Sequence, residues 1–413
     1  IGQPRLCRQT NRPNAGPRIA ARTLRCDHSA HASLPPPRMT PTPTVGLIGS
    51  EGSYGRWLRR FFEERMGLPV LGADPGRAGT VEPDELLDRA QVLVFCAPIR
   101  HTPAIIGDYV KRAAGRERGQ LWLDVTSIKQ APVAAMLASQ AEVVGLHPMT
   151  AAPKAPTLKG RVMVVCEARL EHWRGWLEGF LGALRAQCVR ATPAQHDRIM
   201  ALVQAMVHAG HLAQGGVLAE YAPHLGGLEA LLPFRSASFE LDTAMLSRIL
   251  AMNPAIYEDI QFCNPHVIPM LDALARQIEG LRDLVARGDD AARTQFRRRF
   301  LADTHAALGE RAIAEGNYSF ERVGYLLADL AGERSVSVHL PEDQAGSLRR
   351  LLHAFEHHGV SIASIHSSRT PAGEVHFRLG FEAGVTAAAL APALVQIESE
   401  GIGRVLERSA ELT

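Results

Sequence analysis

The sequence has 413 residues, enough for two or three domains, and its 46% hydrophobic and 21% charged residues are ordinary for a soluble globular protein. The net charge of +2 gives no reason to expect a nucleic-acid partner, and no apolar run reaches the ~18 residues of a membrane-spanning helix. The six cysteines lack CxxC pairs and metal-site spacing, so we expect a cytoplasmic protein without disulfides or a metal site.

Residues 1–43 are rich in arginine and proline and show almost no periodic apolar pattern. Such a segment cannot bury enough surface to offset the entropy lost on ordering, so we expect it to be disordered. Its composition is compatible with an organelle transit peptide. We favour a simpler interpretation, in which the native protein begins at Met39 and the preceding residues are a non-native leader.

A glycine-rich turn follows the first expected strand, Val45–Ile48, and leads into a helix with one apolar face. Glycines let the backbone approach a pyrophosphate, which then lies at the helix N-terminus. The spacing is GxxGxxG instead of the usual GxGxxG, and Glu51 should point to solvent because it would repel the phosphates. The residues expected to bind a dinucleotide here are Gly49, Gly52, Ser53, Tyr54 and Gly55.

The second expected strand, Val70–Ala73, ends at Asp74, about twenty residues after the last glycine of the turn. A carboxylate at this place accepts hydrogen bonds from the adenosine ribose and repels the 2′-phosphate of NADP. Arg77 lies close enough in sequence to offset part of that repulsion. We therefore predict NAD as the cofactor, with NADP as the alternative.

Further strands are expected at residues 92–96, 121–125, 142–146 and 162–165, and none from there to the C-terminal region that begins at about residue 334. Pro98 follows the first of these at the cofactor end and is a candidate cofactor contact, whereas His101 in the same loop is expected to be solvated. Together these elements predict an α/β Rossmann-like domain over residues 44–167.

His147 follows the strand at 142–146, in the segment GLHPM at residues 145–149. A histidine at the carboxyl end of such a strand faces the crevice in which ligands of open α/β sheets bind. Imidazole also exchanges protons near neutral pH. Because a loop histidine is more often a surface residue, the argument for chemistry depends on its surroundings, including the segment DVTSIK at residues 124–129.

An all-α second domain is expected over residues 168–330. Thr192 and Pro193 open a helix that should run to about Glu220, and a second helix follows from about Ser236 to Met252. Helical regions of this kind commonly bury apolar faces against a second subunit, so we expect a homodimer. The first helix carries a stripe that is polar enough to line a cleft: His196, Met200, Gln204 and His208.

Residues 334–407 have the strand and helix order βαββαβ, which is typical of a ferredoxin-like domain. The loop at residues 341–346 leads into the first helix of this domain and is a candidate site for a small ligand. The candidate effector residues are Asp343, Ala345 and Gly346.

Over about residues 44–330 the chain resembles the prephenate dehydrogenases, and residues 334–407 resemble an ACT domain, a module that often binds amino acids. The motifs that carry the resemblance are the glycine turn, DVTSIK at 124–129, GLHPM at 145–149, HDRIMA at 196–201, and Arg248 shortly before Asn253 and Pro254. The resemblance implies hydride transfer from C4 of prephenate to NAD, with loss of CO2 and formation of 4-hydroxyphenylpyruvate in tyrosine biosynthesis.

The resemblance also assigns roles to residues. His147 matches the catalytic histidine that accepts a proton from the C4 hydroxyl, and Ser127 matches a serine between substrate and nicotinamide. Arg248 matches the arginine that binds a substrate carboxylate. Supporting substrate contacts are expected from the helical stripe, at His196, Gln204 and His208.

The sequence departs from the family's motifs at two places, and two alternative functions stay open. Glu240 stands where some members have a second arginine, and Thr150 follows GLHPM without the glycine often found there. An arogenate dehydrogenase would show nearly the same motifs, and acidic residues such as Glu240 or Asp242 would suit the amine of arogenate. A non-catalytic NAD-binding amino-acid sensor is the alternative from another class. The ACT-like domain suggests inhibition by tyrosine.

Overall fold

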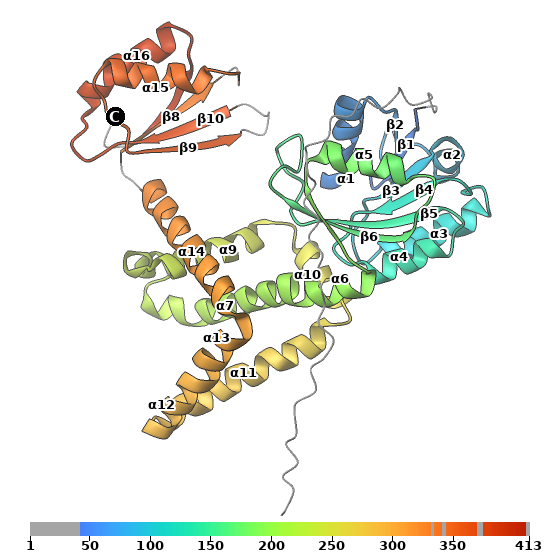
Figure 1. The fold of residues 1–413 in the computed structure, drawn as a ribbon, viewed down its shortest axis with the longest axis horizontal. Coiled ribbons are helices and arrows are strands. Elements are labelled where there is room, and N and C mark those ends of the chain that lie inside the picture. The colour runs from blue at the N-terminus through green and yellow to red at the C-terminus, as the bar shows by residue number, and fades with distance from the viewer. Residues whose placement is uncertain (1–41, 332–333, 341–343, 370–374, 410–413) are drawn as a thin grey trace, which may run out of the picture. The chain divides into compact units, whose positions relative to one another are not determined.

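The computed structural model describes residues 42–331, 334–340, 344–369 and 375–409 (Figure 1). The expectations for a disordered leader therefore fall, except for residues 42 and 43, outside the described residues. The described part contains a seven-stranded sheet, a helical region and a four-stranded sheet, in that order along the chain. No helix in it is both long and apolar enough to cross a membrane.

The seven-stranded sheet has the order β2-β1-β3-β4-β5-β6-β7. β1 to β5 are parallel, β6 is antiparallel to β5, and β7 is parallel to β6. The inner strands are almost wholly buried, as apolar strands covered on both faces must be. The strands are β1 (Val45–Ile48), β2 (Val70–Ala73), β3 (Val92–Phe95), β4 (Leu121–Asp124), β5 (Glu142–Pro148), β6 (Val162–Arg169) and β7 (Gln187–Arg190).

The expectation that strands end by residue 168 is wrong. β6 continues to Arg169, and α5 (Arg174–Leu184) returns the chain to β7 at the edge of the same sheet. The sequence QCVR of β7 is short and half polar because an edge strand buries little of its surface, so it lacks an apolar run. The sheet therefore crosses the predicted domain boundary at residue 167.

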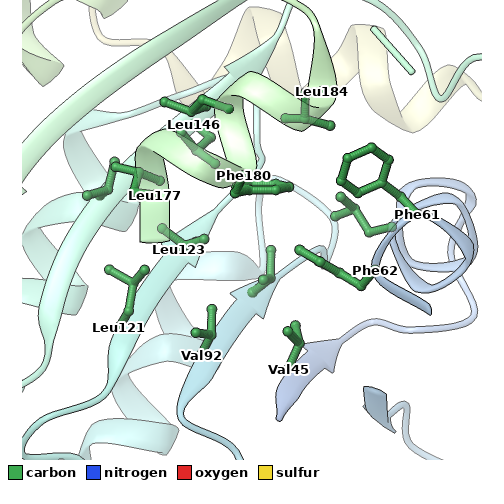
Figure 2. Packing of buried hydrophobic residues seen from close by; sticks show 14 of the residues in the cluster. Val45, Phe61, Phe62, Val92, Leu121, Leu123, Leu146, Leu177, Phe180 and Leu184 are labelled. Atoms are coloured by element: carbon green, nitrogen blue, oxygen red, sulfur yellow. The ribbon is translucent and has the colours of Figure 1, made fainter. Parts of the chain in front are cut away.

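Helices cover both faces of this sheet. On one face, α1 (Ser53–Arg60) and the π-helical turn η1 (Phe61–Arg65) pack with α5, and the rings of Phe62 and Phe180 lie 5.0 Å apart (Figure 2). The second core lies on the opposite face. Its helices are α2 (Pro83–Arg89), α3 (Thr102–Ala113) and α4 (Gln130–Leu137).

The helical region begins as the sequence predicted. The Thr192 hydroxyl accepts a hydrogen bond from the Gln195 N–H at 3.2 Å, and the helix continues through α6, η2 and α7 to Tyr221. The elements are α6 (Pro193–Met200), the π-helical η2 (Ala201–Met206), α7 (Val207–Tyr221), η3 (Ala222–Leu225), α8 (Leu228–Leu231), η4 (Leu232–Phe234), α9 (Ala237–Ala251), α10 (Pro254–Cys263), α11 (Val267–Arg287), α12 (Asp290–Phe296), η5 (Arg297–Ala302), α13 (Asp303–Leu308) and α14 (Glu310–Ala331).

The apolar pattern also predicts long helices from Pro254 to about Ala286 and from Asp289 to about Gly316, and both are interrupted. The pattern after Pro254 breaks at Asn264, whose side-chain oxygen accepts a hydrogen bond from the His266 N–H at 3.0 Å. The pattern after Asp289 breaks at Gly309, which has a φ of +85° that other residues rarely adopt. Apolar periodicity continues across both breaks, so it could not reveal them.

The C-terminal sheet is antiparallel and has the order β11-β8-β10-β9, which confirms the ferredoxin-like arrangement. Gly346, with a φ of +95°, directly precedes α15, whereas the candidate effector residue Asp343 lies outside the described residues. The elements are β8 (Ser335–Leu340), α15 (Ser347–His357), β9 (Ser364–Arg369), β10 (Val375–Gly380), α16 (Ala387–Ser399) and β11 (Arg404–Arg408).

Candidate functional site

The glycine turn after β1 is shaped for a close backbone approach. Gly49 has a φ of +79°, and a Cβ placed on it would lie 3.0 Å from the carbonyl oxygen of Cys96 at the end of β3. A Cβ on Gly55 would lie 2.3 Å from the Gly49 carbonyl oxygen, so only glycine lets α1 start this close to the turn. Because the chain leaves β1 and β3 in opposite directions, this turn lies at the switch point where such sheets bind ligands.

Asp74 lies beside the glycine turn. Its Oδ2 accepts a hydrogen bond from the backbone N–H of Glu51 at 2.9 Å, so this carboxylate also fixes the shape of the turn. The Glu51 carboxylate accepts a hydrogen bond from the Ser50 hydroxyl at 3.3 Å and thus folds back on the turn, where we expected it to point to solvent. Arg77 is exposed close by, and its N–H donates to the Asp74 carbonyl at 3.2 Å.

Tyr54 has a structural partner in addition to its expected place at the cofactor. Its hydroxyl donates to the Thr150 carbonyl at 2.6 Å, and the indole of Trp57 donates to the Ala155 carbonyl at 2.9 Å. Burial raises the pKa of Tyr54, so its hydroxyl stays a donor. These two bonds from α1 hold the loop that follows GLHPM and lacks the glycine. Pro98, the other candidate cofactor contact, is exposed in the loop that follows β3.

A fully buried ion pair joins Lys129 and Asp124, the two ends of DVTSIK. Lys129 Nζ also donates to the Leu146 carbonyl at 2.7 Å and so binds the residue before His147. A Cβ on Gly145 would lie 2.9 Å from Lys129 Cδ, which explains the glycine in GLHPM. Ser127 lies half-buried in the turn between the paired residues.

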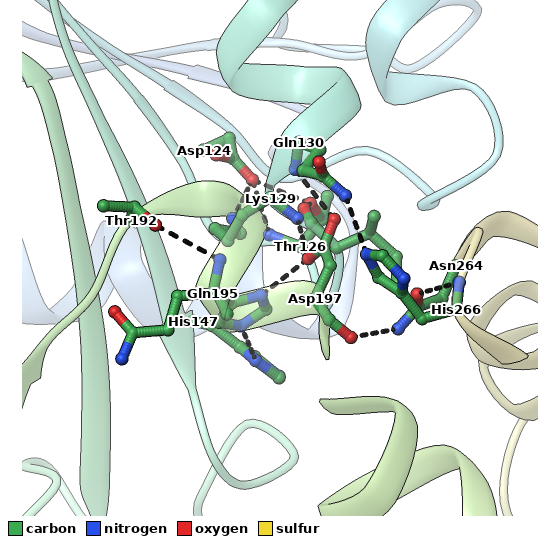
Figure 3. Close-up of polar contacts among 12 residues, drawn as sticks. Asp124, Thr126, Lys129, Gln130, His147, Thr192, Gln195, Asp197, Asn264 and His266 are labelled. Atoms are coloured by element: carbon green, nitrogen blue, oxygen red, sulfur yellow. Dashed lines mark hydrogen bonds and ion pairs between the residues drawn. The ribbon is translucent and has the colours of Figure 1, made fainter. Parts of the chain in front are cut away.

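His147 is 3% exposed and is linked to two residues of α6 (Figure 3). His147 Nδ1 and His196 Nε2 are 2.9 Å apart, and His196 Nδ1 lies 2.7 Å from Asp197 Oδ1. The Asp197 carboxylate also accepts the backbone N–H groups of Lys129 at 2.8 Å and Gln130 at 2.9 Å, at the start of α4. We call these three side chains the His147–His196–Asp197 array.

Burial sets the charge states in this array. It holds the pKa of the His147 imidazole well below its ordinary value, and the neighbouring His196 and Lys129 act in the same direction. Burial likewise lowers the pKa of His196, against the opposing influence of Asp197. Burial disfavours the ionised form of Asp197, but hydrogen bonds from His196 and two backbone N–H groups outweigh it and lower the pKa of this carboxyl. The array therefore holds two neutral imidazoles and one carboxylate at neutral pH.

The stripe along α6, η2 and α7 continues from His196 to two half-buried polar residues. Gln204 Oε1 and His208 Nδ1 are buried and make no hydrogen bond to any described residue. The His208 ring lies 4.8 Å from that of Tyr257, and burial, with His211 nearby, lowers the pKa of His208. Buried polar atoms without partners are costly in a protein, so these two atoms are suited to a ligand.

Arg248 is not joined to this group. It is exposed on α9 and has no hydrogen bond or ion pair within the described ranges. Glu240 lies 3.6 Å from Arg235, and Asp242 lies 3.3 Å from His211, so both carboxylates have cationic or polar partners.

The structure thus brings together His147 and His196, which the sequence singled out separately. Sequence reasoning assigned no role to Lys129 and Asp197, although both stand in motifs that it quoted. The signal that could have found Asp197 is the adjacent pair His196-Asp197, because a carboxylate next to a buried histidine commonly orients the ring.

Three comparisons place the chain among known proteins. A family model described as "Prephenate dehydrogenase, dimerization domain" matches residues 192–300. A 4-amino-4-deoxyprephenate dehydrogenase of Streptomyces pristinaespiralis is 31% identical over 271 residues, which cover 59% of the chain and 85% of that protein. A probable arogenate/prephenate dehydrogenase of Methanocaldococcus jannaschii is 26% identical over 263 residues, or 60% of the chain and 57% of that protein.

The chain thus spans little more than half the length of the Methanocaldococcus relative. Among solved structures, prephenate dehydrogenase from A. aeolicus in complex with hydroxyphenyl propionate and NAD+ is similar, with a TM-score of 0.51 and 15% identity. The match covers 65% of the chain and 100% of that structure, and at this identity it shows a shared fold.

The buried ion pair yields a prediction about stability. Lys129→Met leaves the Asp124 carboxylate buried without its cation, so we expect it to lower the free energy of unfolding by about 3–5 kcal/mol. The double variant Lys129→Met/Asp124→Leu removes both charges and should regain most of the loss. All four tryptophans lie in the sheet region, so fluorescence in urea reports its unfolding. A double variant less stable than the single one would contradict this account.

Proposed function

The chain belongs to the prephenate dehydrogenase family, and we propose that it converts prephenate to 4-hydroxyphenylpyruvate, a step toward tyrosine. In this reaction C4 of the ring is oxidised and the ring carboxylate leaves as CO2. The observation that carries the proposal is His147, buried at the carboxyl end of β5 in the sheet that carries the glycine turn, where burial lowers its pKa and so favours the neutral ring.

The glycine turn fits a dinucleotide. A Cβ on Gly49 or Gly55 would fill the space next to backbone atoms, and the α1 N-terminus is free of a side-chain cap at Gly52. The second oxygen of Asp74 is suited to a ribose hydroxyl, which favours NAD. NAD+, when bound here, supplies the acceptor for the hydride that leaves C4.

His147 is the proposed general base. Its Nδ1 is held by His196, whereas Nε2 makes no hydrogen bond to the residues that the structure describes. Nε2 accepts the proton of the C4 hydroxyl, and electron density returned to that oxygen promotes hydride release from C4. Because the lowered pKa of His147 keeps the ring neutral, activity should fall only as the pH drops through that low value.

We propose substrate contacts at four residues outside the His147–His196–Asp197 array. Gln204 Oε1, an acceptor, and His208 Nδ1, which can accept or donate, are buried and have no partner among the described residues. Both atoms are therefore available to bind polar groups of a substrate. Ser127 adjoins the cofactor crevice in the loop after β4, and we propose that Arg248 binds a substrate carboxylate.

We favour prephenate over arogenate because the acidic residues of α9 already have other partners. Arogenate carries an ammonium group that needs a carboxylate, but Glu240 lies next to Arg235 and Asp242 next to His211. Neither carboxylate is therefore free of a competing partner. Arogenate stays the alternative substrate because the Methanocaldococcus relative is named a probable arogenate/prephenate dehydrogenase.

We further propose that the active form is a homodimer built through the helical region. Large apolar side chains stand exposed there, with Phe234 at 87% and Phe262 at 86%. Such side chains usually mark a protein–protein surface, and the matching family model is described as a dimerization domain.

The direct test is a set of initial rates with prephenate and with arogenate, each with NAD+ and with NADP+. We expect NADH formation with prephenate and NAD+ to be fastest. Faster turnover of arogenate would establish the alternative substrate. NAD binding without NADH formation from either compound would favour the amino-acid sensor.

For the base, His147→Asn should preserve folding and NAD+ affinity but lower kcat by about 10²–10⁴-fold, since that is the usual contribution of a general base. His101→Asn, in an exposed histidine of the same sheet region, is the control and should leave kcat unchanged. Near-normal turnover of His147→Asn would refute the assignment.

Arg248 should act on substrate affinity. Arg248→Ala should raise the KM for prephenate at constant KM for NAD+, at a cost of about 2–5 kcal/mol if a desolvated charge pair is lost. Arg248→Lys should be intermediate because it keeps the charge but not the two-pronged hydrogen bonding. If both variants keep the wild-type KM for prephenate, the carboxylate binds elsewhere.

The preference for NAD+ over NADP+ can be tested by removing the charge of Asp74. Asp74→Asn keeps an oxygen for the Glu51 N–H but removes the charge that would repel a 2′-phosphate. We expect the ratio of kcat/KM for NAD+ over NADP+ to fall, with little change in thermal stability. A wild-type enzyme that already prefers NADP+ would show that Asp74 does not have this role.

We also propose that tyrosine inhibits by binding the ACT-like domain near Ala345 and Gly346, with coupling of about 1–3 kcal/mol to the active site. Gly346→Val forces a side chain onto a φ of +95° and should weaken inhibition without changing kcat. Gly384→Ala, in open space, is the control. Unchanged inhibition in Gly346→Val would indicate simple competition at the active site.

A further inference from the structure

The geometry assigns His196 and Asp197 as positioning residues that fix which nitrogen of His147 carries the proton and that share the charge His147 acquires. The kinetic part of this inference rests on the proposed function, whereas the position of the proton does not. The inference starts from two successive contacts: His147 Nδ1 with His196 Nε2, and His196 Nδ1 with Asp197 Oδ1.

The positions of the protons follow from the carboxylate. An ionised carboxylate only accepts hydrogen bonds, so His196 Nδ1, 2.7 Å from Asp197 Oδ1, must carry a proton. In a neutral ring the other nitrogen, Nε2, is then an acceptor. His147 Nδ1, 2.9 Å away, must therefore donate, which leaves the lone pair of His147 on Nε2. That is the nitrogen required to accept the substrate proton.

Asp197 is held in the ionised form by its place in the fold. Its two oxygens accept the N–H groups of Lys129 and Gln130 at the start of α4, where the helix dipole also favours negative charge. These bonds are among the causes that lower its pKa. The carboxylate is fully buried, so its field on His196 is little screened by water.

The same array accommodates the proton taken from the substrate. When His147 Nε2 receives it, the bond from Nδ1 to its own proton can break as that proton moves to His196 Nε2. His147 is then neutral with its proton on Nε2, and His196 is a cation beside the Asp197 carboxylate. His147 thus exchanges its proton on Nδ1 for one on Nε2, and His196 gains the one additional proton. The positive charge is then on His196, next to the negative charge of Asp197.

Other titratable groups around the array do not replace Asp197. Lys129 and Asp124 are engaged in their own buried pair. Cys166 lies on β6 opposite Gly145, and burial raises the pKa of its thiol to about 12, so it stays neutral. The histidines are thus influenced by one carboxylate in direct contact, that of Asp197.

Asp197 also supports the fold, so the test must separate the two roles. The Asn264 side chain donates to the backbone carbonyl of Asp197 at 2.8 Å. Asn264→Ala removes this bond from the same residue and leaves the carboxylate in place. It is the matched control for a purely structural effect of Asp197→Asn.

The first measurement needs no substrate. In the full chain labelled with ¹⁵N-histidine, His147 resonances are assigned by their loss in His147→Asn. We expect wild type and Asn264→Ala to show a protonated Nδ1 and an unprotonated Nε2. Asp197→Asn should shift the population toward Nε2–H. A wild-type His147 with its proton on Nε2 would overturn the inference even if prephenate is turned over.

The second measurement is the pH dependence of kcat/KM for prephenate. Asp197→Asn removes a charge that stabilises the imidazolium, so the acid limb should move to lower pH and kcat should fall by about 10²-fold. Asn264→Ala should lower the melting temperature but leave the acid limb in place. An Asp197→Asn enzyme with the wild-type acid limb and kcat would refute the inference.

His196→Gln keeps the inference testable if Asp197→Asn does not fold. A glutamine oxygen can accept from His147 Nδ1 but cannot take up its proton. We expect the Nδ1–H form of His147 to be retained while kcat falls at least tenfold. A folded His196→Gln variant with the wild-type kcat would contradict the inference that His196 shares the positive charge acquired by His147. If no variant or wild type turns over prephenate or arogenate, the proposed function fails, and the NMR result still decides the position of the proton.

Discussion

The Asp197 carboxylate connects the two parts of the site. Its oxygens accept hydrogen bonds from the start of α4 in the sheet region and from His196 in its own helix, and its carbonyl accepts one from Asn264 before α11. A single buried charge thereby satisfies a helix N-terminus, fixes the entry of α6 and orients the ring that contacts His147. Without the carboxylate, the N–H groups of Lys129 and Gln130 and Nδ1 of His196 would have no other hydrogen-bond partner among the described residues.

A second buried charge pair fixes His147 from the other side. Lys129 neutralises Asp124 and donates to the carbonyl of Leu146, so the backbone that carries His147 is tied to the end of β4. Desolvating two charges is costly, and such a pair seldom adds stability over an apolar replacement. Its presence next to His147 is explained by geometry, because the lysine stem lies against Gly145 and sets the path of β5.

Local features of the fold were predictable from the sequence. The GxxGxxG turn, the Thr192 cap and the C-terminal βαββαβ order each depend on neighbouring residues, and the structure confirms them. β7 was not predicted because an edge strand needs little apolar surface. The break at Asn264 was not predicted because it depends on a side-chain hydrogen bond that replaces a helical one. The Asp197 contacts join residues 67 and 68 positions apart, which periodicity cannot detect. The sequence singled out His147 by its place after a strand and His196 by a helical stripe, but it could not show that the two rings lie in contact.

The central claim is that oxidation at C4 and loss of the ring carboxylate occur together at His147. The most direct measurement follows NADH and labelled CO2 simultaneously, with prephenate carrying the label in its ring carboxylate. The account predicts one CO2 released for each NADH formed, with the rates of both lowered by the same factor in His147→Asn. NADH formed without an equal amount of CO2, or both formed at wild-type rates in that variant, would contradict it.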